Sequence, residues 1–243
     1  MLQFAEPVPQ EYLAEYRLLS AELDRQLPPK ALDTNLLVAS WNLRAFGEYS
    51  DVWVAGSGVS PKRDKQSLLC IAEIISRFDV VALQEVRGNL SALHHVLRLL
   101  GPHWGFSMTD VTRGAPGNDE RMAFLFDTRK LQLSGLACEL VVPAEQLSQI
   151  SAEALNKQFA RTPYAVSFRT VGHTFILVTL HVLYGANPAD RGPELTAIAR
   201  WLSDWARNAY EGESNLIALG DFNIDRQGDA LYQAFTSTGL FIP

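Results

Sequence analysis

Polar residues suited to phosphate-ester hydrolysis follow four largely apolar runs of this sequence. The runs span 36–41, 80–84, 175–180 and 216–220, and they lead into Asn42, Glu85, His181 and Asp221, with Asn223 two positions later. Glu85 and the amide oxygen of Asn42 are hard oxygen ligands of the kind that magnesium prefers. Asp221 could orient or deprotonate a water, Asn223 could donate to a phosphate oxygen, and His181 could transfer a proton near neutral pH. Cleavage of a phosphate ester needs a positioned nucleophile, charge neutralisation and a protonated leaving group, and this set supplies most of them.

The runs themselves predict the elements that would position these residues. Short segments rich in Val, Ile and Leu indicate strands that are buried on both faces. A polar group inside such a strand needs a partner, whereas a polar group at its carboxyl end emerges from the sheet. We therefore expect the four strand ends to form one shared site at one edge of a sheet core. Taken singly, each residue has an ordinary structural interpretation, such as an Asx turn for Asp221 and Asn223 or a buried, satisfied ring for His181.

Six segments in order carry a resemblance to a known family. They are Ser-Trp-Asn42-Leu-Arg, Leu-Gln-Glu85-Val, Asp119 to Asp127, Arg161 to Val166, Thr-Leu-His181 and Leu-Gly-Asp221-Phe-Asn223. Together they resemble the motifs of the endonuclease/exonuclease/phosphatase family, which deoxyribonuclease I typifies, and the resemblance covers about residues 35–236. It implies a four-layer α/β/β/α sandwich of two packed mixed sheets at 35–243, behind a helical extension at 1–34. It also implies Mg²⁺, with Mn²⁺ as an alternative.

The resemblance assigns roles to seven residues. Metal binding falls to Glu85 and Asn42, phosphate binding to Arg161, Asn223 and Asn42, and catalysis to Glu120, His181, Asp221 and Asn223. Glu120 would orient His181 and keep it protonated, while Asp221 would align the attacking water. We expect all seven side chains in one cleft, with Glu120 about 2.6–3.2 Å from His181 or joined to it through one water.

The resemblance leaves the substrate open. DNA ranks first, because residues 118–121 resemble the nuclease branch, and a lipid or small phosphoester is the alternative. The family normally closes with an Asp-His segment, whereas this sequence reaches Pro243 without one. The sequence thus predicts a chain cut short at its carboxyl end, of weak activity, or a non-catalytic member that keeps the fold.

Composition predicts one large soluble domain rather than a membrane or disulfide-rich protein. The 243 residues are 47% apolar, and they contain no run long enough to span a bilayer and no secretory signal at the start. Two cysteines, Cys70 and Cys138, make no disulfide framework, so a cytoplasmic location is expected. The net charge of −6 argues against tight, sequence-independent binding of DNA, and no protein partner can be inferred.

Periodicity and turn residues predict the order of elements. Helices are expected at 10–27, 61–77, 89–100, 192–209 and 229–237, with Ser60 and Asn89 as N-caps of the second and third. Strands are expected at 35–41, 79–85, 104–109, 121–127, 131–142, 163–170, 174–181 and 215–221. The strands at 121–127 and 131–142 are predicted to be antiparallel neighbours, and those at 163–170 and 174–181 to form a hairpin. Residues 144–160 read as a polar loop or short helix.

Overall fold

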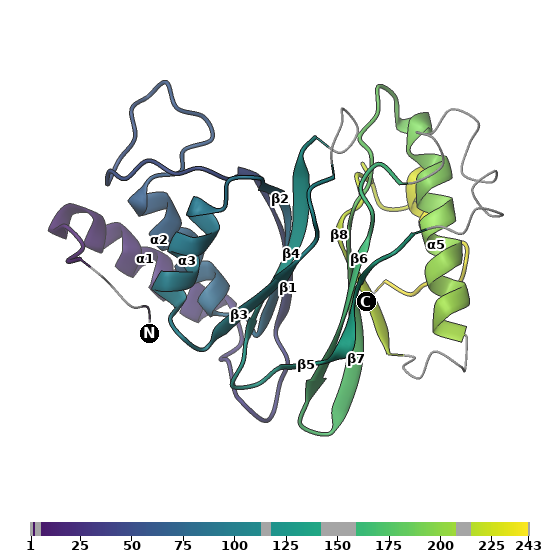
Figure 1. Cartoon of the computed structure of the whole chain (residues 1–243), viewed down its shortest axis with the longest axis horizontal. Helices are drawn as coiled ribbons and strands as arrows, with labels where there is room; N and C mark the ends of the chain where they lie inside the picture. Colours follow the sequence, from purple (N-terminus) through teal and green to yellow (C-terminus); the bar gives the residue numbers. More distant parts are fainter. Residues whose placement is uncertain (1, 3–5, 113–117, 142–158, 208–214, 243) are drawn as a thin grey trace. The chain divides into compact units, whose positions relative to one another are not determined.

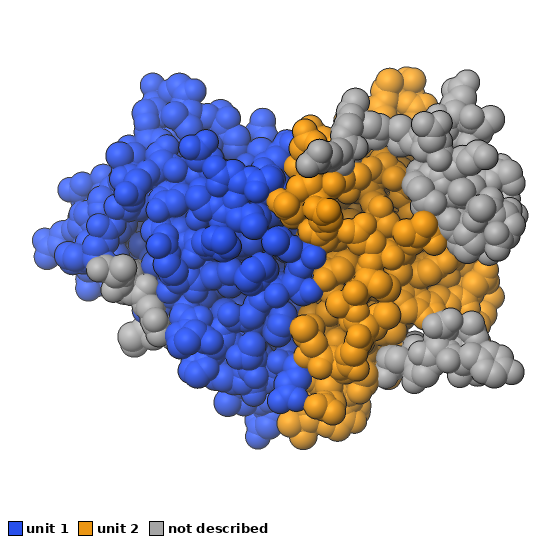
Figure 2. All heavy atoms as spheres, in the orientation of Figure 1, with its two compact units in different colours: residues 1–108, 123–132 blue, residues 109–122, 133–243 orange. Residues whose placement is uncertain are grey.

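Two compact units make up the structure. The computed structural model describes residues 2, 6–112, 118–141, 159–207 and 215–242. Unit 1 comprises residues 1–108 and 123–132, and unit 2 comprises residues 109–122 and 133–243 (Figure 2). Each unit contains a four-stranded mixed sheet with helices against it (Figure 1). The predicted α/β class with two mixed sheets is confirmed.

The sheet of unit 1 is built on a strand–helix–strand repeat. Its strands lie in the order β1 (Val38–Phe46), β2 (Val80–Arg87), β4 (Glu120–Asp127) and β3 (Trp104–Met108). The helix α2 (Lys65–Ser76) connects β1 to the parallel strand β2, and α3 (Ser91–Leu100) follows. The amino-terminal helix α1 (Gln10–Gln26) packs against α2. This crossover places the carboxyl ends of β1 and β2 at the same edge of the sheet.

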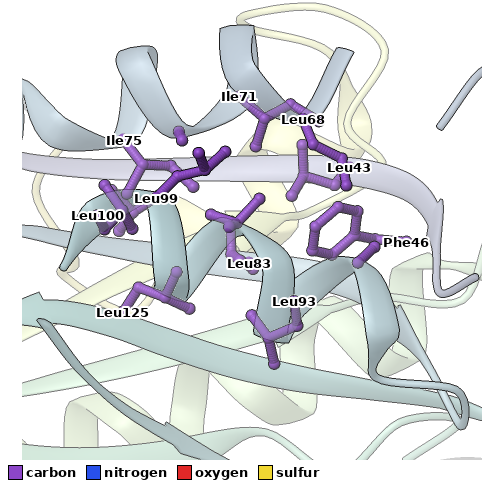
Figure 3. Packing of buried hydrophobic residues seen from close by; sticks show 14 of the residues in the cluster. Leu43, Phe46, Leu68, Ile71, Ile75, Leu83, Leu93, Leu99, Leu100 and Leu125 are labelled. Atoms are coloured by element: carbon purple, nitrogen blue, oxygen red, sulfur yellow. The ribbon is translucent and has the colours of Figure 1, made fainter. Parts of the chain in front are cut away.

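Apolar side chains of α2 and α3 cover one face of that sheet. The residues labelled in Figure 3 are Leu43, Phe46, Leu68, Ile71, Ile75, Leu83, Leu93, Leu99, Leu100 and Leu125. On α2 they recur at helical spacing, which turns one stripe of the helix toward the strands. Removing this apolar surface from water is the main force that fixes the helices on the sheet.

Unit 2 repeats the same arrangement with other strands. Its sheet has the order β5 (Gln132–Glu139), β6 (Tyr164–Thr170), β7 (His173–His181) and β8 (Leu216–Asp221). The hairpin of β6 and β7 is confirmed, and α5 (Gly192–Arg207) leads from β7 to the parallel strand β8. A short 3₁₀ helix, η2 (Pro188–Asp190), precedes α5. The last helix, α6 (Ala230–Thr236), packs against α5. Leu195, Ile198 and Leu202 of α5 belong to the core of this unit.

Three local predictions were wrong or incomplete. The strands at 121–127 and 131–142 are not neighbours, because β4 belongs to one sheet and β5 to the other. The second helix begins at Lys65 rather than at Pro61, since Asp64 supplies the cap by accepting the Ser67 N–H at 2.9 Å. Asn89 accepts the Ser91 N–H at 2.9 Å, but the residue at the N-cap position of α3 is Leu90. The prediction for 144–160 falls almost wholly outside the described residues.

A buried ionic network ties the segment after α1 to the rest of unit 1. Lys130 donates to Asp79 Oδ2 at 2.9 Å and to the backbone carbonyls of Ala31 and Asn35. Lys30 donates to Asp127 Oδ2 at 2.8 Å, and its Nζ lies 3.7 Å from Asp79 Oδ1. The side chains of Asp79 and Asp127 are completely buried. Such carboxylates are tolerated only because cations and N–H groups surround them.

Candidate active site

In unit 1, Asn42 and Glu85 lie side by side on the parallel strands β1 and β2. The strand predicted to end at residue 41 continues to Phe46, so Asn42 lies within β1 rather than after it. Asn42 pairs in register with Gln84, the residue before Glu85. Asn42 Nδ2 donates to Glu85 Oε1 at 2.9 Å, and the Ala45 N–H donates to Glu85 Oε2 at 2.9 Å. The register slips by two residues between Asn42 and Phe46, and this bulge turns the Ala45 amide toward the carboxylate. The pairing of parallel strands therefore brings together the two residues predicted to bind metal.

In unit 2, Glu120 joins Arg161 and His181. Arg161 Nε donates to Glu120 Oε2 at 2.7 Å, and Asn118 Nδ2 donates to Oε1 at 2.6 Å. His181 Nδ1 lies 3.3 Å from Glu120 Oε2, but the geometry of this contact is not that of a hydrogen bond. This distance is slightly longer than the expected 2.6–3.2 Å. Glu120 is only 2% exposed, so its negative charge acts on Arg161 and His181 with little screening by water.

Asp221 and Asn223 lie on the other side of the His181 ring. His181 pairs in register with Asp221 across β7 and β8, and His181 Nε2 lies 3.9 Å from Asp221 Oδ2. Asp221 Oδ1 accepts the Asn223 N–H at 3.1 Å, and Asn223 Nδ2 donates to the carbonyl of Val182 at 2.7 Å. Gly220 makes this approach possible, because a Cβ there would lie 2.0 Å from the Leu180 carbonyl oxygen.

Unfavourable backbone conformations concentrate at these residues. Among the described residues, those other than glycine with positive φ are Arg44, Ala45, Glu85, Asn118, Asp119 and Asn223. Each is a candidate site residue or lies within three positions of one. Residues in this region of conformational space carry a free-energy cost of about 1–3 kcal/mol, and they persist where the surroundings impose them, often at functional sites. The backbone strain of the described residues therefore coincides with the candidate site residues.

The structure therefore assembles the seven predicted residues as two groups. Asn42 and Glu85 form one, and the other consists of Glu120, Arg161, His181, Asp221 and Asn223. The prediction that all seven share one cleft stays a prediction. A hollow of about 660 Å³ opens beside Asp221 and Asn223 in unit 2, and Tyr232 also lines it.

Comparison with protein families identifies the family of this chain. The sequence profile of the Endonuclease/Exonuclease/phosphatase family matches residues 39–241. The chain belongs to this family. The predicted resemblance is confirmed, and the family comprises hydrolases that act on phosphate esters.

Two relatives of the endonuclease/exonuclease/phosphatase family are named deoxyribonucleases. The chain is 29% identical over 212 residues to the deoxyribonuclease of Thioalkalivibrio sp. (strain K90mix), covering 84% of this chain and 50% of that protein. It is 26% identical over 202 residues to bovine deoxyribonuclease-1, covering 80% of this chain and 62% of that one. The chain thus spans about half to three fifths of the length of these relatives.

Solved structures confirm the fold of the family. A family protein from Bacteroides thetaiotaomicron superimposes with a TM-score of 0.58 at 22% identity, covering 85% of this chain and 70% of the other. The catalytic domain of human Nocturnin, solved with a bound sulfate anion, gives a TM-score of 0.53 at 18% identity, covering 84% and 70%. Within the described ranges, no helix of this chain combines the length and apolarity needed to cross a membrane.

The chemistry of Asn42 and Glu85 fits a divalent cation. Each oxygen of the Glu85 carboxylate accepts one of the hydrogen bonds above, and a carboxylate oxygen has two lone pairs, so capacity remains for a metal. Magnesium commonly binds through one or two carboxylates and keeps several waters. No cluster of three or more His, Cys, Asp or Glu residues suited to a metal occurs in the described part of the chain. A cation here would therefore rely on one carboxylate, one amide, water and phosphate.

The sequence interpretation assigned no role to three residues that contact the group around Glu120, His181 and Asn223. Asn118 donates to Glu120, while Arg191 and Glu194 bind the backbone of the segments that carry the candidate residues. Asn118 could have been noticed in its turn-rich segment. Arg191 and Glu194 stand at the start of a helix, where charged residues are usually solvated, so the sequence contains no signal for them.

Proposed function

We propose that this protein is a divalent-metal-dependent phosphodiesterase that cleaves DNA. The observation that carries the proposal is the position of His181, with Glu120 Oε2 3.3 Å from one ring nitrogen and Asp221 Oδ2 3.9 Å from the other. A histidine with a carboxylate near each ring nitrogen is held in one orientation, from which it can donate to a phosphate oxygen or transfer a proton. The place of the Thr-Leu-His181 motif in the order of the family motifs supports the same role.

The residues of unit 2 would bind and activate the reactants. Asp221, with part of its carboxylate open to solvent, would align a water for in-line attack. Arg161 would neutralise phosphate charge, and Asn223 and His181 would donate to non-bridging oxygens. Glu120 would hold Arg161 and His181 in their orientations, since its carboxylate is buried against both.

The pair in unit 1 would hold the metal. Glu85 and Asn42 would bind Mg²⁺ or Mn²⁺, and Asn42 would also contact phosphate. When bound, the cation would supply charge stabilisation for the phosphate oxygens. The backbone amide of Ala45 fixes the Glu85 carboxylate in place, so the ligand needs little reorganisation before it binds.

DNA is the favoured substrate because both curated relatives named above are deoxyribonucleases. The hollow of about 660 Å³ beside Asp221 and Asn223 has a size that would accept a nucleotide. A small phosphoester is the second candidate. The net charge of −6 favours it, because binding of long polyanions usually draws on a positive surface.

Plasmid nicking tests the proposal. The full protein encoded by the gene is incubated with supercoiled plasmid and Mg²⁺, and a parallel reaction contains a chelator. We expect metal-dependent nicking, which Glu85→Gln and Asp221→Asn each reduce by about 10²–10³-fold. Asp204→Asn, on the exposed side of α5, is the matched control and should retain full activity.

A small chromogenic diester separates the two candidates. Hydrolysis of the diester without nicking would replace DNA by a small phosphoester as the substrate. Absence of metal-dependent hydrolysis of both substrates would overturn the proposal and favour a non-catalytic family member. Full activity of Glu85→Gln would refute the assignment of the metal ligand.

A further inference from the structure

Arg191 is a buried guanidinium that binds two segments of the proposed site. It immediately precedes α5 and is only 3% exposed. Its Nε donates to the Tyr184 carbonyl at 2.6 Å, and its Nη1 donates to the Asn223 carbonyl at 2.8 Å and to Asp225 Oδ1 at 3.0 Å. The guanidinium also lies 4.3 Å from the centre of the Tyr184 ring. One side chain therefore joins the segment after His181 to the segment that contains Asn223.

Glu194, in the first turn of α5, binds two backbone amides of the same region. Its Oε2 accepts the Leu183 N–H at 3.2 Å, and its Oε1 accepts the Ala160 N–H at 3.3 Å. Leu183 lies two residues after His181, and Ala160 immediately precedes Arg161. The carboxylate is buried, and the charges of Arg161 and His181 act on it electrostatically.

The contacts of Arg191 and Glu194 differ from those of most charged residues at the start of a helix. A charged residue in the first turn normally meets solvent or caps its own helix. Here the Arg191 side chain donates to Tyr184, Asn223 and Asp225, which lie outside α5, and Glu194 accepts from amides that lie 34 and 11 positions away. Burying two charges is costly, so the contacts they make must compensate for lost hydration.

We infer that Arg191 and Glu194 form a positioning clamp for phosphodiester hydrolysis. The clamp fixes the segments that carry Arg161, His181 and Asn223 to the start of one rigid helix. This inference rests on the proposed function. Neither residue is assigned a contact with substrate; each acts through the backbone of its neighbours, so that the phosphate-binding groups keep their spacing as substrate enters.

The expected effect on activity follows from the sensitivity of catalysis to geometry. A displacement of about 1 Å of a positioning group can lower the rate about 10²-fold. Arg191→Met removes all the donors of the guanidinium while keeping an unbranched side chain. We expect a 10- to 100-fold fall in kcat, on the same order as that estimate. Arg191→Lys keeps the charge but lacks the planar set of N–H donors, so its kcat should recover only part of the loss.

A double-mutant cycle separates positioning from general destabilisation. If Arg191 acts through Asn223, then Arg191→Met should have little further effect on kcat once Asn223→Ala is present. Arg207→Met is the matched control, because Arg207 lies at the other end of α5, is exposed and donates to the Thr238 carbonyl. Its kcat should equal that of the wild type. Should Arg191→Met fail to fold, the cycle is run with Arg191→Lys.

Amide hydrogen exchange tests the clamp without activity. In Arg191→Met, residues 182–187 and 222–226 should exchange at least about tenfold faster, on the scale of local opening, while β6 keeps its protection. Unchanged exchange in both segments would overturn the clamp. Faster exchange with unchanged kcat would overturn its role in positioning, as would additive effects of the Arg191 and Asn223 substitutions. An inactive wild type would remove the proposed function, and exchange would still decide whether the clamp exists.

Discussion

Replacement of Lys130 by Met should be among the most destabilising single changes in unit 1. The Lys130 side chain is 2% exposed, and its ammonium group is shared between the Asp79 carboxylate and the carbonyls of Ala31 and Asn35. Methionine fills a similar volume but donates nothing. The substitution therefore leaves a fully buried carboxylate without its nearest cation, together with two carbonyls without their donor.

The structure sets the size of the effect. Removing one partner of a buried ion pair costs about 3–5 kcal/mol. Asp79 would keep the Leu37 N–H, at 2.7 Å from Oδ2, and the Lys30 ammonium, at 3.7 Å from Oδ1. These contacts place the expected loss near the lower limit, at about 3 kcal/mol. For a chain of this length the unfolding midpoint should fall by roughly 6–12 °C.

Equilibrium unfolding by urea and by heat measures this loss. Arg129→Met is the matched control: Arg129 is the adjacent residue and also pairs with a buried carboxylate, at 2.5 Å from Asp127, but its side chain is 49% exposed. Its loss should be smaller than that of Lys130→Met, because the Arg129 guanidinium is half exposed to water and Asp127 keeps Lys30 at 2.8 Å. Adding Asp79→Asn to Lys130→Met should recover part of the stability, because the unpaired charge disappears. Equal losses for Lys130→Met and Arg129→Met would show that burial of the pair does not matter and would refute the reasoning.

Two further predictions concern pH. Burial opposes ionisation of Asp127, but hydrogen bonds from Arg129 and Lys30 outweigh it and hold the pKa of Asp127 far below its usual value. Its contribution to stability is therefore present above the unfolded pKa of about 4 and lost as the pH falls toward the folded pKa. In urea titrations, the free energy of unfolding of Asp127→Asn should therefore decline less steeply between about pH 4 and 2 than that of the wild type. Identical slopes would contradict this. Burial raises the pKa of Glu194 above its unfolded value of about 4.3, so its contribution is lost as the pH rises. Glu194→Gln should therefore gain stability relative to the wild type as the pH rises above about 4, and a constant difference would show that the Glu194 pKa is not raised.

Local patterns in the sequence were sufficient to predict most of the elements. The runs before Asn42, Glu85, His181 and Asp221 are strands, and each pair of them encloses a helix. Parallel strands joined in this way end at the same edge of a sheet, so the neighbours Asn42 with Glu85 and His181 with Asp221 follow from chain order. The family motifs also indicated Glu120 and Arg161, which hydrogen-bond one another.

The tertiary structure alone decided which distant segments meet. The separation of β4 from β5 depends on the partner that each strand pairs with, and the sequence of neither strand specifies that partner. The contact of Lys130 with Asp79 joins positions 51 residues apart, and that of Arg191 with the Asn223 carbonyl joins positions 32 residues apart. A charged residue in the sequence resembles any solvated one, because its burial is determined by the packing of other elements around it. The sequence by itself thus determined the strands, their polar ends and the family, whereas the partners of the buried charges depend on long-range packing, which leaves no local periodicity.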